Sequence, residues 1–392
     1  MRELSIYIHI PFCVRKCLYC DFLSFAVLGA ENDGRTGPAA GNPEKTMESY
    51  VNLLEREVRA AADRYKDYQV ISIFWGGGTP SLLPGETVGG LMELIRKYYR
   101  VLPDAEITIE TNPGTLTADK LRAYRKAGIN RLSIGLQSAK DEELARIGRI
   151  HDYRTFQETY RLARDFGFHN INIDLMAALP GQSVDSYGET LRRTAELGPE
   201  HISAYSLILE EGTPLYERQA QYRFPTEEED REMYLLTDSC LSAYGYHRYE
   251  ISNYARPGYE CRHNKVYWER GDYVGFGVGA ASMVDNVRWS NPAEPEEYEA
   301  YTADRREPET AGILTGAEQM EEFMFLGLRM MCGVSRQRFE ELYGQRIEEV
   351  YGAVLYRLYR QELLVCEADR IRLTVRGIDV SNYVMAQFLF DR

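Results

Sequence analysis

The sequence has 392 residues, is 44% hydrophobic, and carries a formal net charge of −14. No apolar run reaches the roughly 18 residues of a transmembrane helix, and the opening MRELSIYIHI lacks the regions of a signal peptide and predicts a strand instead. The acidic balance argues against binding to a nucleic-acid backbone as the main activity. Seven cysteines in a chain of this kind suit a reducing compartment. We therefore expect a cytoplasmic protein with one large α/β domain and a smaller domain.

Six strand-like runs recur in the first 210 residues, and helix-like runs such as 47–65 and 152–167 separate them. The strand-like runs are 4–12, 70–77, 106–112, 131–138, 170–180 and 201–210. Alternation of strands and helices predicts a parallel sheet. Several runs also alternate polar and apolar residues, as Ser5, Tyr7 and His9 do with the isoleucines between them. Because successive strand side chains point to opposite faces, we expect a curved, partly closed barrel whose polar interior holds a polar ligand.

The rest of the chain divides into two further parts. Residues 211–312 are irregular apart from a helix near 226–244, which Thr226 is placed to cap. The run GFGVGA at 275–280 lacks the strand–helix context of a dinucleotide site and predicts close backbone packing. From about residue 313 the pattern is helix, helix, helix and short strands, which is the order of a winged helix. The expected domains are therefore 1–210, 211–312 and 313–392, and the acidic last domain favours docking or lid function over DNA binding.

Three cysteines lie within HIPFCVRKCLYCDF, residues 9–22, at the spacing C-x3-C-x2-C. The run follows the first predicted strand, where parallel α/β folds place their chemistry. A structural zinc site takes four protein ligands, whereas three thiolates on an iron–sulfur cluster leave one iron open. Free thiols or an incomplete zinc site are the alternatives. Three of the other cysteines occur in helix- or strand-like runs and are expected to be buried small hydrophobes, namely Cys240, Cys332 and Cys366.

Tyr7, the HIPFC run and the cysteine spacing together resemble the radical S-adenosylmethionine (SAM) superfamily. In particular they resemble its branch of oxygen-independent coproporphyrinogen dehydrogenases and HemW-type heme chaperones. The resemblance covers nearly the whole chain, including its C-terminal part. It implies a partial (β/α)6 barrel with a C-terminal helical, winged-helix-like domain. It also implies a [4Fe–4S] cluster with SAM at its open iron, the cluster ligands being Cys13, Cys17 and Cys20.

The SAM site is expected at the ends of the strands. The run FWGGGTPS at 74–81 is not a P-loop, because no Gly-Lys-Ser/Thr follows it, and it resembles the superfamily's glycine motif. Glu110, Gln137, Arg149 and Asp174 end or follow later strands; singly, each could be an ordinary surface or hydrogen-bonded residue. The resemblance implies that SAM is bound by Tyr7, Gly77, Gly78, Thr79, Glu110, Gln137, Arg149 and Asp174.

Two departures separate this chain from the dehydrogenases. Those enzymes have a fourth cysteine two residues after the third, and here that position is Phe22. They also carry an extension before the first strand, whereas this chain starts almost at its first strand. Both departures argue against decarboxylation of coproporphyrinogen.

The run HNKVYW, residues 263–268, resembles the His-Asn-x-x-Tyr-Trp signature of the heme-chaperone branch. An imidazole can ligate heme iron, and aromatic rings can pack on the macrocycle; His263 is therefore the candidate heme ligand, with Cys261 as its rival. The resulting prediction is a heme chaperone that delivers heme to an acceptor hemoprotein. The acceptor could belong to a respiratory chain, and the prediction allows peripheral contact with a membrane. The alternative is an enzyme that uses a SAM-derived radical to decarboxylate coproporphyrinogen III oxidatively. The sequence leaves open whether SAM is turned over.

Overall fold

A curved sheet dominates the molecule, and the computed structural model describes it within residues 1–27, 43–304 and 311–390. Its centre is six parallel strands in chain order: β1 (Arg2–Ile10), β4 (Tyr68–Gly77), β5 (Val101–Thr111), β6 (Arg131–Gln137), β7 (Ile171–Ala177) and β8 (His201–Ser206). These strands coincide with the six runs that the sequence predicts. The prediction of a curved, partly closed barrel of parallel strands is confirmed.

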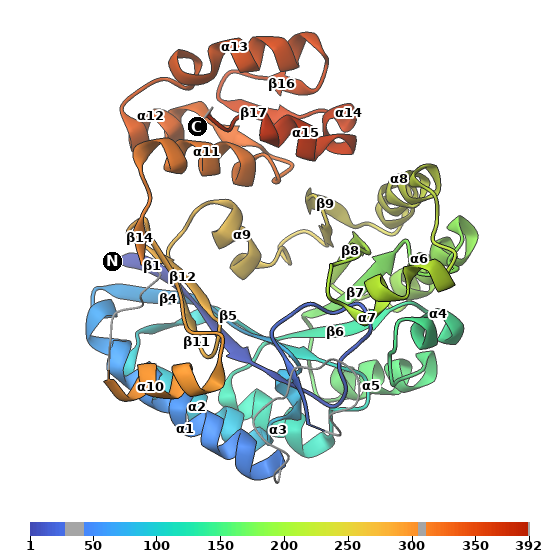
Figure 1. The fold of residues 1–392 in the computed structure, drawn as a ribbon, viewed down its shortest axis with the longest axis vertical. Coiled ribbons are helices and arrows are strands. Elements are labelled where there is room, and N and C mark those ends of the chain that lie inside the picture. Colours follow the sequence, from blue (N-terminus) through green and yellow to red (C-terminus); the bar gives the residue numbers. More distant parts are fainter. Residues whose placement is uncertain (28–42, 305–310, 391–392) are drawn as a thin grey trace.

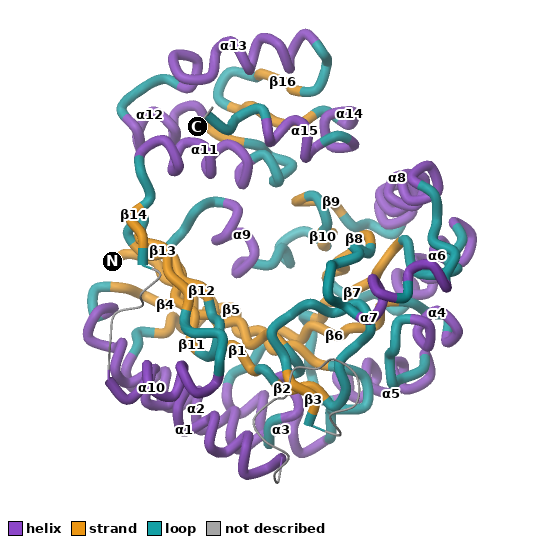
Figure 2. The backbone as a smooth tube through the Cα atoms, in the orientation of Figure 1, coloured by secondary structure: helices purple, strands orange, loops and turns teal. Residues whose placement is uncertain are grey.

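Helices cover the convex side of this sheet, as Figures 1 and 2 show. They are α1 (Pro43–Ala61), α2 (Gly85–Tyr98), α3 (Ala118–Ala127), α4 (Asp141–Arg146), α5 (Tyr153–Asp165) and α6 (Val184–Glu196). Side-chain caps on Thr117, Asp152 and Ser183 begin α3, α5 and α6. Buried isoleucines such as Ile6 and Ile73 belong to the core beneath these helices, so the polar residues between them face the concave side.

The segment after β8 extends the sheet at both edges. At one edge, β11 (Tyr273–Phe276) pairs in parallel with β1, and β12 (Ala281–Val284), β13 (Val287–Ser290) and β14 (Gly312–Ile313) follow it in antiparallel order. At the other edge, β10 (Asn253–Ala255) and β9 (His247–Glu250) add to β8. The other strands and α-helices that precede the C-terminal part are β2 (Phe12–Cys13), β3 (Phe25–Ala26), α7 (Pro214–Glu217), α8 (Glu227–Ala243), α9 (Arg262–Trp268) and α10 (Pro295–Asp304). The expectation of an irregular segment missed these strands because each is only two to four residues long.

The last part of the chain has a core of its own. It comprises α11 (Gly316–Gly327), β15 (Val334–Ser335), α12 (Arg336–Tyr343), α13 (Ile347–Arg360), β16 (Leu364–Cys366), β17 (Arg370–Leu373), α14 (Val375–Asp379) and α15 (Ser381–Ala386). Its three strands form a sheet in the order β15-β17-β16, and Phe339 and Leu358 are fully buried against it. Within the described part of the chain, no helix is long and apolar enough to span a membrane.

Ion pairs attach this C-terminal part to the sheet. Glu322 of α11 pairs with Arg270, which follows α9, at 3.0 Å and with Arg288 of β13 at 2.5 Å. Arg329 reaches the fully buried Glu250 of β9 at 3.5 Å. Figure 1 shows α9 on the concave side of the sheet, between the strands and the C-terminal helices. Helix α9 therefore covers part of the concave side.

The glycines of GFGVGA pack closely, as the sequence predicts. A Cβ on Gly275 would lie 2.4 Å from the carbonyl oxygen of Ala281. Gly277 has a φ of 108°, and a Cβ there would lie 2.5 Å from the hydroxyl of Tyr50. Both positions therefore need glycine for steric reasons.

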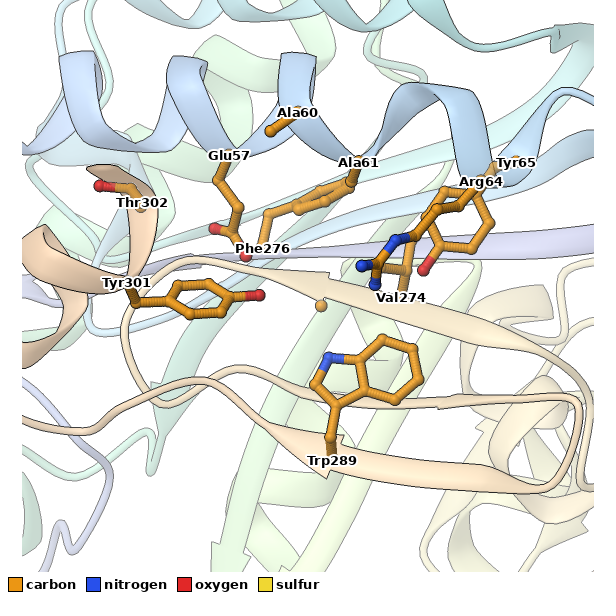
Figure 3. A pocket seen from close by; sticks show the side chains of 11 residues that line it. Glu57, Ala60, Ala61, Arg64, Tyr65, Val274, Phe276, Trp289, Tyr301 and Thr302 are labelled. Carbon is orange, nitrogen blue, oxygen red and sulfur yellow. The ribbon is translucent and has the colours of Figure 1, made fainter. Parts of the chain in front are cut away.

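Glu57 of α1 anchors this glycine segment from inside the protein. Its carboxylate accepts hydrogen bonds from the Gly277 amide at 2.8 Å, the Asn291 amide at 2.7 Å and the Tyr298 hydroxyl at 2.7 Å. Figure 3 shows Glu57 pointing from its helix toward the strands, beside a small cavity. Burial raises the pKa of Glu57 from 4.5 to about 7 despite the three donors.

Replacing Glu57 with Gln should make the free energy of unfolding less dependent on pH. The folded-state pKa lies above the unfolded one, so the contribution of Glu57 is fully present below pH 4.5 and is lost as the pH rises through 7. Measured by urea unfolding, the wild type should lose about 3 kcal/mol relative to Glu57→Gln between pH 4.5 and pH 8. A difference that stays constant over this range would show that the carboxyl group is ionised in the folded protein throughout.

Candidate functional site

A cavity of about 350 Å³ opens at the carboxyl ends of the central strands, where parallel α/β folds bind their ligands. The structure brings all three cysteines of the cysteine run and most of the predicted SAM residues to the wall of this cavity. They are Cys13, Cys17, Cys20, Gly77, Gly78, Thr79, Glu110, Gln137, Arg149 and Asp174. Residues distant in sequence thus meet in one place, which is the geometry that a ligand site requires.

Tyr7 is the one predicted SAM residue that does not line this cavity. Its hydroxyl lies 3.1 Å from Nδ1 of His9, and its ring stacks on Phe74 with the centroids 6.4 Å apart. Burial raises the pKa of Tyr7 well above its ordinary value. In this structure Tyr7 therefore packs in the barrel interior, behind the cavity.

The three cysteines are held by the loop that follows β1. Thr79 donates a hydrogen bond to Sγ of Cys13 at 3.7 Å, and Arg149 donates one to Sγ of Cys17 at 3.5 Å. Burial raises the pKa of Cys13, and it raises that of Cys20 to about 12. Since metal ligands must be thiolates, iron binding here would displace protons.

The cysteine sulfurs suit a cluster better than a single ion. Among the described residues, no three His, Cys, Asp or Glu side chains are placed to hold one metal ion. In an iron–sulfur cubane each thiolate binds a different iron, so the sulfurs need not converge on one point. Half-buried thiols around a shared cavity match that requirement.

Gly77 and Gly78 are glycines because of the chain's own packing. Gly77 has a φ of 107°, and a Cβ there would lie 2.5 Å from the ring of His9. A Cβ on Gly78 would lie 2.6 Å from the carbonyl oxygen of Phe12, next to Cys13. Packing alone therefore requires glycine at both positions, and a side chain at Gly78 would displace the segment that carries Cys13.

Two partly buried carboxyl groups face this cavity. Burial, with the nearby Asp174 as the next cause, raises the pKa of Glu110 to about 8. Burial also raises the pKa of Asp174, although Ser133 donates to it at 2.9 Å and Asn172 at 2.8 Å. A pair of desolvated acids favours a cationic ligand, and SAM carries an ammonium and a sulfonium.

Other buried polar atoms at this cavity have no partner. Arg149 donates to Asn112 and to the Gly135 carbonyl, both at 2.6 Å, but its Nε is unpaired, as is Oε1 of Gln137. Buried polar groups are normally hydrogen-bonded, so these atoms are consistent with a polar ligand. Sequence reasoning missed Asn112, although it directly follows β5 and the rule that sites gather at carboxyl ends of strands points to it.

His263 occupies a different environment. Its Nδ1 lies 2.9 Å from the Ser72 hydroxyl and its Nε2 lies 2.9 Å from the Tyr267 hydroxyl, while its ring stacks on Phe74. Burial lowers its pKa to about 3. The rival ligand Cys261 is fully buried against Glu106. Both nitrogens of His263 are therefore engaged within the protein, which does not favour its role as an iron ligand in this conformation.

The cysteines outside the cysteine run do not all have the burial that the sequence predicts. Cys240 and Cys366 are half-buried, whereas Cys332 is exposed. The expectation of a buried Cys332 is wrong because the residue lies in the turn between α11 and β15 rather than within an element.

Comparisons with known proteins agree with this geometry. The radical SAM superfamily matches residues 7–194, and the HemN C-terminal domain matches residues 314–380. The heme chaperone HemW of Bacillus subtilis is 36% identical over 389 residues, covering 98% of this chain and 99% of that protein. The chain belongs to the HemW family. The HemW protein of Escherichia coli is 41% identical over 284 residues, which is 72% of this chain and 71% of that protein.

A solved structure shares the HemW-family fold. Coproporphyrinogen III oxidase (HemN) from Escherichia coli, a radical SAM enzyme, superposes with a TM-score of 0.84 at 25% identity, covering 99% of this chain and 90% of that chain. Radical SAM membership brings a [4Fe–4S] cluster and SAM, and the thiols, acids and unpaired polar atoms of the cavity fit both. A [4Fe–4S] cluster held by Cys13, Cys17 and Cys20 would be able to supply an electron to SAM bound beside it. Glu110 and Asp174, which line the cavity with raised pKa values, would hold the sulfonium and ammonium of SAM.

Cys17→Ala should abolish the cluster. The variant removes one of three thiolates from a centre that has no fourth protein ligand in the run, so iron and sulfide content and visible absorption after anaerobic reconstitution should fall to background. Cys240→Ala, a half-buried cysteine on α8, serves as the matched control and should reconstitute normally. Retention of the cluster in Cys17→Ala would show that the ligand set is wrong.

SAM binding should strengthen as the pH rises through the pKa of Glu110. Below about pH 8 the buried Glu110 is protonated, and binding a cation must first remove that proton, which costs up to about tenfold in affinity per pH unit. Calorimetric titration of reconstituted protein between pH 6.5 and 8.5 would measure this. Glu110→Gln should bind SAM more weakly at pH 8.5 and with a flatter pH profile; an unchanged profile in the variant would exclude Glu110 from SAM binding.

Proposed function

We propose that this protein binds heme and delivers it to an acceptor hemoprotein in the cytoplasm. The observation that carries the proposal is similarity to a curated heme chaperone along 98% of the chain and 99% of that protein. Similarity of this extent includes the cysteine run, the barrel and the C-terminal part together. A relationship restricted to the barrel would support only a radical SAM protein of undefined purpose.

A coproporphyrinogen dehydrogenase is the second candidate, and the structure of HemN is its main support. At 25% identity the fold is shared, but one position of the cysteine run differs in character. Phe22, where the dehydrogenases place cysteine, is 68% exposed and lines the mouth of the cysteine cavity. An apolar ring at this mouth replaces a thiol, which supports the chaperone over the decarboxylase.

We further propose that the acceptor is a hemoprotein of a respiratory chain, reached by peripheral contact with the membrane. The C-terminal part, residues 313–392, is a candidate docking domain, because its α13 exposes Tyr356 and Tyr359 at 67% and 55%. Aromatic residues of this kind are enriched at interfaces between proteins.

The two candidate functions separate in one anaerobic assay. Reconstituted protein is incubated with SAM, a reductant and either coproporphyrinogen III or hemin. We expect hemin to bind with a shifted Soret band and to pass to an apo-hemoprotein, and we expect no accumulation of protoporphyrinogen IX. Multiple turnovers of coproporphyrinogen III, without hemin binding, would contradict the chaperone proposal and support the dehydrogenase.

A further inference from the structure

A second large cavity, of about 530 Å³, lies between the end of α9 and the C-terminal part. It shares no lining residue with the cysteine cavity, and its size falls in the range of ligand sites. We propose that this cavity is the heme site, with Sγ of Cys332 as the axial ligand of the iron. The inference rests on the proposed function, namely that the chain binds heme, and adds where and through which groups it does so.

Three residues of the mixed polar and apolar wall offer flat or apolar contacts. Trp268 contributes from α9, while Phe323 and Met330 contribute from α11 and the turn after it. The guanidinium of Arg329 lies over the Trp268 ring at 4.3 Å from its centroid, which fixes the indole plane. The indole Nε1 is buried without a partner. Of the HNKVYW segment, Trp268 is thus the residue that reaches the cavity, whereas His263 is turned into the barrel.

Cys332 is the cysteine in the wall of this cavity. The thiol is exposed, and it donates a long hydrogen bond of 3.7 Å to the Gly333 carbonyl. Gly333 has a φ of 64°, and a Cβ there would lie 2.0 Å from the carbonyl oxygen of Ile371. The turn therefore requires glycine, and that requirement holds Cys332 in place at the wall. Thiolates are established axial ligands of heme iron, and the neighbouring Met330 is only 6% exposed.

Charge at the rim suits the propionates of heme. Arg338 and Arg370 line the cavity with side chains 60% and 48% exposed, and their ion pairs to Glu341 and Asp369 are long, at 3.4 and 3.6 Å. Exposed pairs of this kind are weak and can exchange for a better partner.

The other charged groups of the cavity define the orientation. Arg270 is nearly buried; it forms an ion pair with Glu322 and donates hydrogen bonds to Tyr343 and Asn286. Glu3 and Glu269 are exposed acids on the same wall and would repel carboxylates. The propionates should therefore point toward Arg338 and Arg370, on the C-terminal side of the cavity.

The test uses the full-length protein and two probes, hemin and metal-free protoporphyrin IX, titrated into wild type and variants. Cys332→Ser should change the ferric Soret band and weaken hemin binding by about tenfold or more, but leave protoporphyrin binding unchanged, because only hemin has an iron to ligate. The double variant Arg338→Glu, Arg370→Glu should weaken both probes by about three- to tenfold. Cys366→Ser and Arg360→Glu, at positions that do not line the cavity, are the matched controls and should behave as wild type.

Each failure has its own meaning. If wild type binds neither probe, the proposed function itself falls. If wild type binds hemin but Cys332→Ser and the double variant match it in spectrum and affinity, the cavity is excluded while the chaperone proposal stands. Loss of the hemin spectrum in His263→Gln with an unchanged spectrum in Cys332→Ser would assign the iron to His263 and overturn the inference.

Discussion

The polar face of the parallel strands is the constraint on which the rest of the structure depends. Strands packed on one side by helices turn their alternate residues inward, and here those residues are polar. Buried polar groups must be paired, because leaving one unpaired costs about 1–3 kcal/mol. The chain meets this requirement in the deep part of the barrel through α9. His263 bonds Ser72, and Glu106 accepts hydrogen bonds from the backbone amides of Arg262 and His263.

At the carboxyl ends of the strands, some inward-facing polar groups have no partner among the described residues. There the inward face includes Glu110 and Asp174 with raised pKa values, and buried atoms of Gln137 and Arg149 that have no partner. By the same rule, these groups favour a cationic, polar ligand at the open end. This division explains how one barrel can contain both a well-packed interior and a cofactor cavity. It also explains why the HNKVYW segment is needed for the barrel whatever its part in heme binding.

Local patterns in the sequence were sufficient for the six central strands and the cysteine run, whereas the cavity residues were predicted from strand ends together with the resemblance to the radical SAM superfamily. Period-two alternation and the position of residues at strand ends depend only on neighbours in the chain. The environment of His263 was not predictable in this way, because its partners Ser72 and Tyr267 include a residue 191 positions away. The exposure of Cys332 and the tight contact of Gly78 with Phe12 likewise depend on how distant segments meet. The short edge strands were missed because two to four residues give too little periodicity.

The central claim is that cofactor and cargo occupy separate cavities, one at the carboxyl ends of the strands and one between the end of α9 and the C-terminal part. An anaerobic crystal structure of the reconstituted protein with SAM and hemin would test it most directly. The account predicts the cluster on Cys13, Cys17 and Cys20 with SAM beside Glu110, and heme between Trp268 and Cys332 with His263 still bonded to Ser72. Heme density inside the barrel, with α9 displaced and His263 on the iron, would contradict it.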